Sequence, residues 1–390
     1  MIPLSVPNII GNEKKYVNQA LEEGWVSTAG KFVDKFESDV ASYIKSSFTV
    51  ACQSGTAGLH MALRYAGVGQ GDLVIAPTLT FIAPINTIKY MGANPIFMDC
   101  DSTLCLDPKK LRYFCENECD FASGTLIHKR SGKKIKAIIV VHVFGNMANM
   151  EEIVSIKDKY NLFLIEDATE ALGTYYTNGK FKGKYAGTIG DIGVFSFNGN
   201  KIITTGGGGM VTCNNEGMAK KIKYWSTQAK DDTLNFVHNE IGYNYRMTNV
   251  QAAIGIGQLE KLEEFIKVKK ENYFQYKEFF DCDNNFNLLP FNDDIRPNYW
   301  FYSLELKSNL ANKRSQIINQ LQSLGIQTRP IWRLIHKQIP YKDDIAYKIE
   351  LAEKYEQYIL NIPCSSSLNH SEVSYVCENL KNLIIGDSLI

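Results

Sequence analysis

The sequence lacks a long hydrophobic run, an excess of either charge and any metal-binding pattern of cysteines. Its longest apolar stretch, around residues 137–141, is far too short to cross a membrane. The first residues, Met-Ile-Pro-Leu-Ser-Val, lack the basic start and apolar core of a signal peptide. Lys plus Arg and Asp plus Glu number 42 each, so the charge does not favour a nucleic-acid partner. The nine cysteines form no C-x-x-C pair, which predicts reduced thiols, no bound metal and a cytoplasmic location.

The 390 residues, 45% of them hydrophobic and 22% charged, predict a large core with a main domain and a smaller one. Short apolar runs alternate with helical patterns, which is typical of parallel α/β proteins. Strands are expected at residues 48–52, 73–76, 95–99, 136–142, 163–166, 192–196, 209–213 and 299–306. Helices are expected at residues 12–23, 31–44, 150–160, 313–324 and 371–384, with one long helical pattern from about 249 to 280. The polar stretch 115–136 is expected to be a solvated surface excursion.

One lysine stands in an unusual setting. Lys201 follows a strand-like apolar run and a turn of Asn and Gly, and it precedes the glycine run 206–209. A lysine held in such a loop can lose its hydration, keep a neutral amine and attack a carbonyl to form an imine. A solvated surface lysine is the ordinary alternative, and three other segments argue against it.

Two of these segments can hold the two ends of a phosphorylated pyridine cofactor. Residues 54–64 open a helix with small residues, so the N–H groups of Gly55 and Thr56 and the helix dipole suit a phosphate. Residues 162–171 read as a buried strand that delivers Asp167, whose carboxylate can keep a pyridine nitrogen protonated. In both cases an ordinary helix cap is the alternative.

The third segment, residues 241–253, is a polar turn flanked by aromatic residues that leads into a helix. Its amide and guanidinium groups can reach an anionic ligand, or the turn can be a plain helix cap with Thr248 or Asn249 as the capping residue. His142 ends an expected strand beside the same region, and a buried histidine with satisfied partners is its favoured interpretation.

Together these segments resemble the DegT/StrS family of sugar aminotransferases, which depend on pyridoxal 5'-phosphate (PLP). The resemblance implies an α/β protein of fold type I, like aspartate aminotransferase, with a mostly parallel central sheet. It divides the chain into an amino-terminal arm with a large PLP-binding domain, residues 1–255, and a linking helix with a small domain, residues 256–390. The motifs that carry it are Ser54-Gly-Thr-Ala, Glu166-Asp167-Ala, Ser196-Phe-x-x-x-Lys201 and Gly242-Tyr-Asn244-x-Arg246-Met, and it extends from Gly24-Trp-Val-Ser27 to Leu360-Asn-Ile-Pro363.

The resemblance also assigns roles to single residues. Lys201 matches the lysine that binds the cofactor as an imine, and Asp167 matches the partner of the pyridine nitrogen. Gly55, Thr56 and Ser196 match groups that hold the cofactor phosphate.

Further positions match the surroundings of the cofactor. Asn244 matches an asparagine that the other protomer supplies to the phosphate, which implies a homodimer with shared active sites. Phe81 matches an aromatic ring stacked on the cofactor, and Glu170 stands at the ring hydroxyl, where Gln or His is common. Gly207 stands where the family usually has an acidic residue. Candidates for substrate binding are Ser27, Tyr245, Arg246, Arg329 and His336.

The resemblance implies transfer of an amino group from L-glutamate to a 4-keto-6-deoxy sugar linked to UDP or GDP. The run from Ser196 to Thr205 and the excursion near Lys129 are similar to the branch that makes 4-amino sugars for bacillosamine, legionaminic acid or perosamine, and legionaminic acid is the first choice. A PLP-dependent sugar dehydratase is one alternative, although such relatives usually carry histidine in place of Lys201. A regulatory or binding protein without catalysis is the other.

Overall fold

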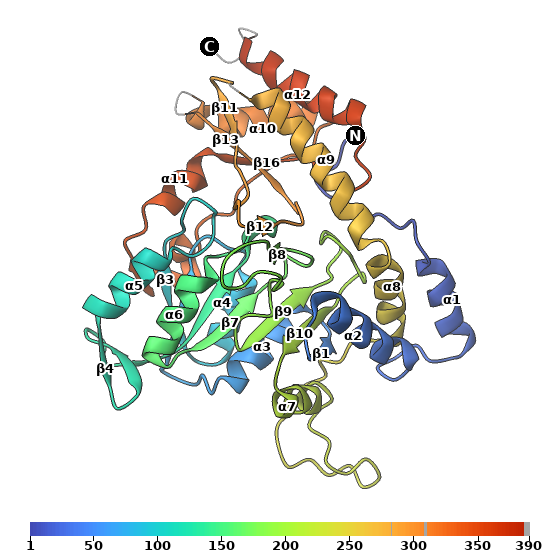
Figure 1. Ribbon diagram of the computed structural model, residues 1–390, viewed down its shortest axis with the longest axis vertical. Helices are drawn as coiled ribbons and strands as arrows, with labels where there is room; N and C mark the ends of the chain where they lie inside the picture. Colours follow the sequence, from blue (N-terminus) through green and yellow to red (C-terminus); the bar gives the residue numbers. More distant parts are fainter. Residues whose placement is uncertain (282, 308–309, 386–390) are drawn as a thin grey trace.

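A ten-stranded sheet forms the centre of the larger body of the protein in the computed structural model, which describes residues 1–281, 283–307 and 310–385 (Figure 1). Six neighbouring strands of its main path run parallel, while the two strands at one end, residues 48–52 and 209–213, run antiparallel to their neighbours. The expected mostly parallel sheet is therefore present. Eight of its strands follow in the order β1 (Phe48–Cys52), β10 (Gly209–Cys213), β9 (Ile192–Ser196), β7 (Phe163–Asp167), β6 (Lys134–Val141), β2 (Leu73–Pro77), β3 (Asn94–Met98) and β15 (Ile345–Tyr347), and the other two form a hairpin beside β6.

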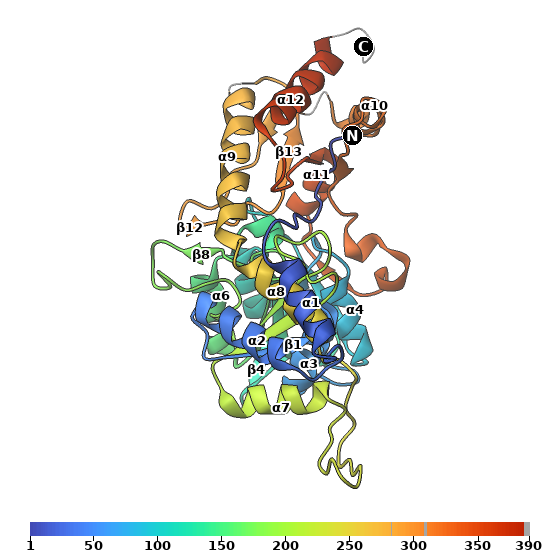
Figure 2. The same cartoon turned by 90° about the vertical axis from the view of Figure 1, so that its right-hand side faces the viewer.

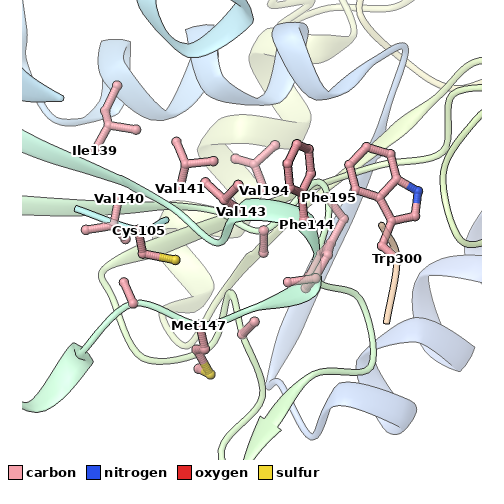
Figure 3. Packing of buried hydrophobic residues seen from close by; sticks show 14 of the residues in the cluster. Cys105, Ile139, Val140, Val141, Val143, Phe144, Met147, Val194, Phe195 and Trp300 are labelled. Carbon is pink, nitrogen blue, oxygen red and sulfur yellow. The ribbon is translucent and has the colours of Figure 1, made fainter. Parts of the chain in front are cut away.

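Helices cover the faces of this sheet, which explains why its central strands are apolar along their whole length. Every residue of β2 and β10 is buried. Figure 3 shows part of this core, in which Val141 of β6 and Val194 of β9 belong to the same buried cluster as Phe144 and Trp300. The surrounding helices are α3 (Gly55–Tyr65), α4 (Ala83–Tyr90), α5 (Pro108–Asn117), α6 (Met150–Tyr160) and α7 (Glu216–Ser226).

The expected long helix from 249 to 280 is wrong, because two helices occupy that stretch. The first, α8 (Asn249–Leu259), packs against α1 (Glu13–Glu22) and α2 (Lys31–Ile44). The second, α9 (Leu262–Phe280), contacts β11 (Phe286–Leu288) and α12 (His370–Ile385). The chain turns between them because the two apolar faces have different partners, and no local pattern reveals that change.

A four-stranded antiparallel sheet forms the second body, and α9 leads into it from the first (Figures 1 and 2). Its order is β11 (Phe286–Leu288), β13 (Tyr302–Leu306), β16 (Ile359–Ile362) and β14 (Arg329–Pro330). The helices of this part are α10 (Arg314–Ser323), α11 (Leu351–Tyr358) and α12 (His370–Ile385). A small pair joins β8 (Tyr175–Tyr176) to β12 (Ile295–Arg296). The domain boundary at residue 255 stays a prediction: it falls inside α8, and β15 of the later part pairs with β3 of the large sheet.

The stretch 115–136 is largely exposed, as expected of a surface excursion, but it is ordered: β4 (Cys119–Ala122) and β5 (Thr125–His128) form a hairpin that pairs with β6. Leu126 is buried opposite Ile135, so this hairpin extends the core. The strand expected from residue 299 begins at Tyr302, because Tyr299 has a positive φ of 54° and the chain bends there toward the site described below.

Candidate active site

A cavity of about 390 Å³ lies where β7 and β9 end and α3 begins. The carboxyl ends of parallel strands are the usual ligand-binding edge of such a sheet. Seven residues expected at the site line this cavity: Gly55, Thr56, Phe81, Asp167, Glu170, Ser196 and Lys201. Side chains distant in the sequence thus meet in one place.

The amine of Lys201 lies between a carboxylate and an aromatic ring. Its Nζ is 3.6 Å from Glu170 Oε1 and 4.3 Å from the centre of the Trp300 ring. The side chain is only 12% exposed, so bulk water reaches it poorly. This arrangement keeps a reactive amine in a defined position inside the cavity.

Asp167 supplies a second carboxylate at the end of β7. The N–H of Thr169 donates to its Oδ1 at 3.1 Å. Burial raises the pKa of Asp167, and the hydrogen bonds from Thr169 and the charge of Lys201 oppose that rise. A buried carboxylate of this kind is suited to pair with a protonated ring nitrogen, because the positive charge compensates the carboxylate for the water that it lost on burial.

His142 has partners on both ring nitrogens, as its favoured interpretation predicted. Its Nε2 lies 2.8 Å from Glu166 Oε2, and the N–H of Ala148 donates to its Nδ1 at 3.2 Å. Since Nδ1 accepts a hydrogen bond, the ring proton is on Nε2 and is donated to Glu166. Glu166 directly precedes Asp167 on β7, so the His142–Glu166 pair lies next to the strand end that carries Asp167.

Glu170 is buried and shared between a cation and the main chain. The N–H of Phe144 donates to its Oε2 at 2.8 Å, while Oε1 faces Lys201. Burial raises the pKa of Glu170 to about 7, although the charge of Lys201 opposes the rise. The side chain can therefore hold or release a proton near neutral pH.

The start of α3 forms a cradle for an anion on the other side of the cavity. Ser54 caps the helix by accepting the N–H of Ala57, while the N–H groups of Gly55 and Thr56 have no preceding helical turn to bond. A side chain at Gly55 would be crowded, since a Cβ there would lie 3.0 Å from both Cβ of Ser196 and Cγ2 of Thr169. The donors and the charge at this helix end fit a phosphate.

Four aromatic residues of the cavity region were not anticipated from the sequence. Trp300, Phe301 and Trp332 line the cavity, and the Phe144 ring lies 4.5 Å from that of Trp332. Three of them come from the part of the chain after α9. Tryptophan is rare here, with four residues in the chain, and its clustering with other rings near residue 300 is the only signal that the sequence offers.

Six expected site residues do not line this cavity. The guanidinium of Arg246 is buried in an ion pair with Glu37 and donates to the carbonyl of Ala51 at 3.2 Å. This N–H donor, expected to bind substrate, is therefore paired with other residues of the fold. Tyr245 lies against the ring of His60, with its hydroxyl 3.3 Å from Nδ1.

The other four lie at separate places. Nδ1 of His336 is 2.7 Å from the hydroxyl of Thr78. Asn244 is exposed, Arg329 is exposed on β14, and Ser27 is exposed before α2. Their expected roles stay predictions, and Asn244 is free to reach a partner subunit.

The described residues hold no group of three or more His, Cys, Asp or Glu side chains arranged to bind a metal ion. No helix in that part of the chain is long and apolar enough to cross a membrane.

The mostly parallel sheet and a lysine beside two buried carboxylates define an enzyme of fold type I, the class that uses PLP. The model of the DegT/DnrJ/EryC1/StrS aminotransferase family matches residues 7–381, and the chain belongs to this family. The aminotransferases of this family depend on PLP.

Relatives and a solved structure agree with this assignment. GDP-perosamine synthase of Escherichia coli O157:H7 is 38% identical over 379 residues, which cover 97% of each protein. GDP-perosamine synthase of Caulobacter vibrioides is 35% identical over 386 residues, 98% of each. The structure of Helicobacter pylori PseC, an aminotransferase involved in the biosynthesis of pseudoaminic acid, covers 98% of both chains with a TM-score of 0.87 at 23% identity. The predicted family, fold class and sugar aminotransferase activity are confirmed.

Proposed function

We propose that this enzyme transfers an amino group from L-glutamate to a GDP-linked 4-keto-6-deoxy sugar. The observation that carries the proposal is the position of the Lys201 amine, 3.6 Å from Glu170 in a cavity that also contains Asp167. A transamination needs one amine that moves protons and one carboxylate that stabilises a protonated ring.

The residues around the cavity fit PLP. The N–H groups of Gly55 and Thr56 with the hydroxyl of Ser196 would hold its phosphate, and Asp167 would pair with its ring nitrogen. Bound there, PLP supplies the carbonyl carbon that carries the amino group and a ring that withdraws electrons.

The chain's own groups would then divide the work. Lys201, when its amine is free, acts as base and acid for the proton that moves during amino transfer. Glu170, with a pKa of about 7, can hold a proton beside that amine. The aromatic residues Trp300 and Trp332 narrow the space on one side and limit the entry of water.

The nucleotide is inferred from the relatives, because two GDP-perosamine synthases match nearly the whole chain. The sequence-based choice of legionaminic acid stays a prediction. The chain carries Lys201 and not the histidine typical of related dehydratases, which argues for amino transfer.

The test is an assay of the purified protein with PLP, L-glutamate and a panel of GDP- and UDP-linked 4-keto-6-deoxy sugars. Mass spectrometry of the sugar and measurement of 2-oxoglutarate follow the two halves of the reaction. We expect an amino sugar from a GDP-linked acceptor, and none with Lys201→Ala. A preference for a UDP-linked acceptor would overturn the nucleotide, and no amino sugar from any acceptor despite bound PLP would overturn the function.

A further inference from the structure

Trp300 connects the part of the chain after α9 to the reactive lysine. Its ring lies under the Lys201 amine, 4.3 Å from ring centre to Nζ, and stacks on Phe301 with 4.1 Å between ring centres. Trp300 is only 2% exposed, and an ammonium group over a desolvated tryptophan face is favourably placed.

The indole also holds the loop that carries the lysine. Its Nε1–H donates to the carbonyl of Asn200, the residue before Lys201, at 2.8 Å. One side chain therefore contacts both the main chain of the lysine loop and the amine at the end of the lysine side chain.

Asn298 fixes Trp300 to the loop that carries Glu170. The main-chain N–H of Trp300 donates to Asn298 Oδ1 at 3.0 Å, and Asn298 Nδ2 donates to the carbonyls of Glu170 and Leu172 at 2.9 and 3.0 Å. Gly145 leaves the space for this amide, since a Cβ at Gly145 would lie 2.0 Å from Asn298 Oδ1. The segment 298–300 thus bridges the lysine loop and the carboxylate loop.

We propose that Trp300 is a positioning residue, which holds the free Lys201 amine opposite Glu170. The charged groups that act on this amine are Glu170 and Asp167, and Trp300 adds a neutral face that attracts the ammonium without accepting its proton. The catalytic role of the contact between Trp300 and Lys201 rests on the proposed function, whereas the contact itself forms without the cofactor.

The test measures the reactivity of Lys201 in the cofactor-free protein. Competitive acetylation at one fixed pH, read by peptide mass spectrometry, gives the acetylation rate of Lys201 relative to the other lysines. Without the ring face and its hydrogen bond to the lysine loop the amine is held less firmly and is less shielded, so we expect Trp300→Leu to raise the acetylation rate of Lys201 several-fold. Trp300→Phe keeps a weaker ring face and should raise the rate less. In the PLP-loaded enzyme, both variants should lower kcat more than they change the KM for glutamate.

Trp225→Phe is the matched control, because Trp225 Nε1 donates to Glu240 at 2.9 Å and Trp225 does not line the cavity. It removes one indole hydrogen bond and should leave the acetylation rate of Lys201 unchanged. Chemical denaturation confirms that each variant is folded. A folded Trp300→Leu protein with the wild-type acetylation rate would overturn the positioning role. Acetylation needs neither PLP nor sugar, so this failure is distinct from the absence of amino transfer in the wild type.

Discussion

At the scale of single residues, Glu170 is the group whose protonation changes near neutral pH. Burial raises its pKa from an ordinary 4.5 to about 7, so the folded chain keeps a proton that the unfolded chain has released. The free energy of unfolding of the cofactor-free protein should therefore fall as pH rises from about 4.5 to about 7, by roughly 3 kcal/mol at most. Glu170→Gln removes this titration and should show a weaker decline. Urea denaturation of both proteins at several pH values measures the difference, and parallel curves would contradict the raised pKa.

Arg246 provides a second test at this scale, because its expected substrate role competes with a buried ion pair. Its side chain is 6% exposed and paired with Glu37, so Arg246→Met removes the buried partner of this carboxylate and leaves it the N–H of Ala51 and the more exposed Lys223, 3.6 Å away. We expect a loss of about 3 kcal/mol in unfolding free energy and no specific rise in the KM for the nucleotide sugar. The double variant Glu37→Met with Arg246→Met should recover part of the loss. A large KM increase in a stable Arg246→Met protein would restore the substrate role.

At the scale of elements, Asp99 joins the large sheet to α11. It follows β3 and accepts the N–H groups of Glu350 and Leu351, both at 2.9 Å, and of Ala352 at 2.8 Å. Lys110 adds an ion pair of 2.7 Å. The carboxylate of one segment thus caps a helix about 250 residues later in the chain.

Asp99→Ala should leave these donors unpaired and destabilise the fold by about 3 kcal/mol or more. The exposed Asp343, in the same region, offers the control Asp343→Ala, which should change stability by less than about 0.5 kcal/mol. Urea denaturation compares the two. Equal stability of the variants would mean that α11 does not depend on Asp99.

At the scale of the whole molecule, the segment between α7 and α8 extends away from the larger body (Figures 1 and 2). It exposes Leu234 and Phe236, at 83% and 70%, and Asn244 lies near its end. Such apolar exposure is consistent with burial against a second copy of the chain. We propose a homodimer in which Asn244 reaches the cofactor phosphate of the partner.

Mixing two inactive proteins tests this arrangement. Lys201→Ala and an Asn244 variant with a bulky replacement, combined under subunit exchange, give mixed dimers with one intact site each. Random exchange makes half of the dimers mixed, so about a quarter of wild-type activity should return. Gel filtration checks that both variants dimerise. Absence of recovery despite proven exchange would place Asn244 in its own subunit's site.

The sequence alone determined those strands and site residues whose positions depend on local patterns. The strands 192–196 and 209–213 lie where expected, because a strand inside the sheet with both faces covered needs a mostly apolar run. Asp167 and Lys201 meet in one cavity as expected, because parallel strands bring their carboxyl ends to one edge of the sheet.

Only the tertiary structure decided which residues complete the site. Trp300 bonds to Asn200 of the lysine loop from 100 residues away, and Arg246 pairs with Glu37 across 209 residues. The turn between α8 and α9 and the hairpin β4–β5 also depend on partners that lie elsewhere in the chain. Such contacts leave no periodic pattern in the sequence, because their energy comes from burial and hydrogen bonds that exist only once the chain has folded.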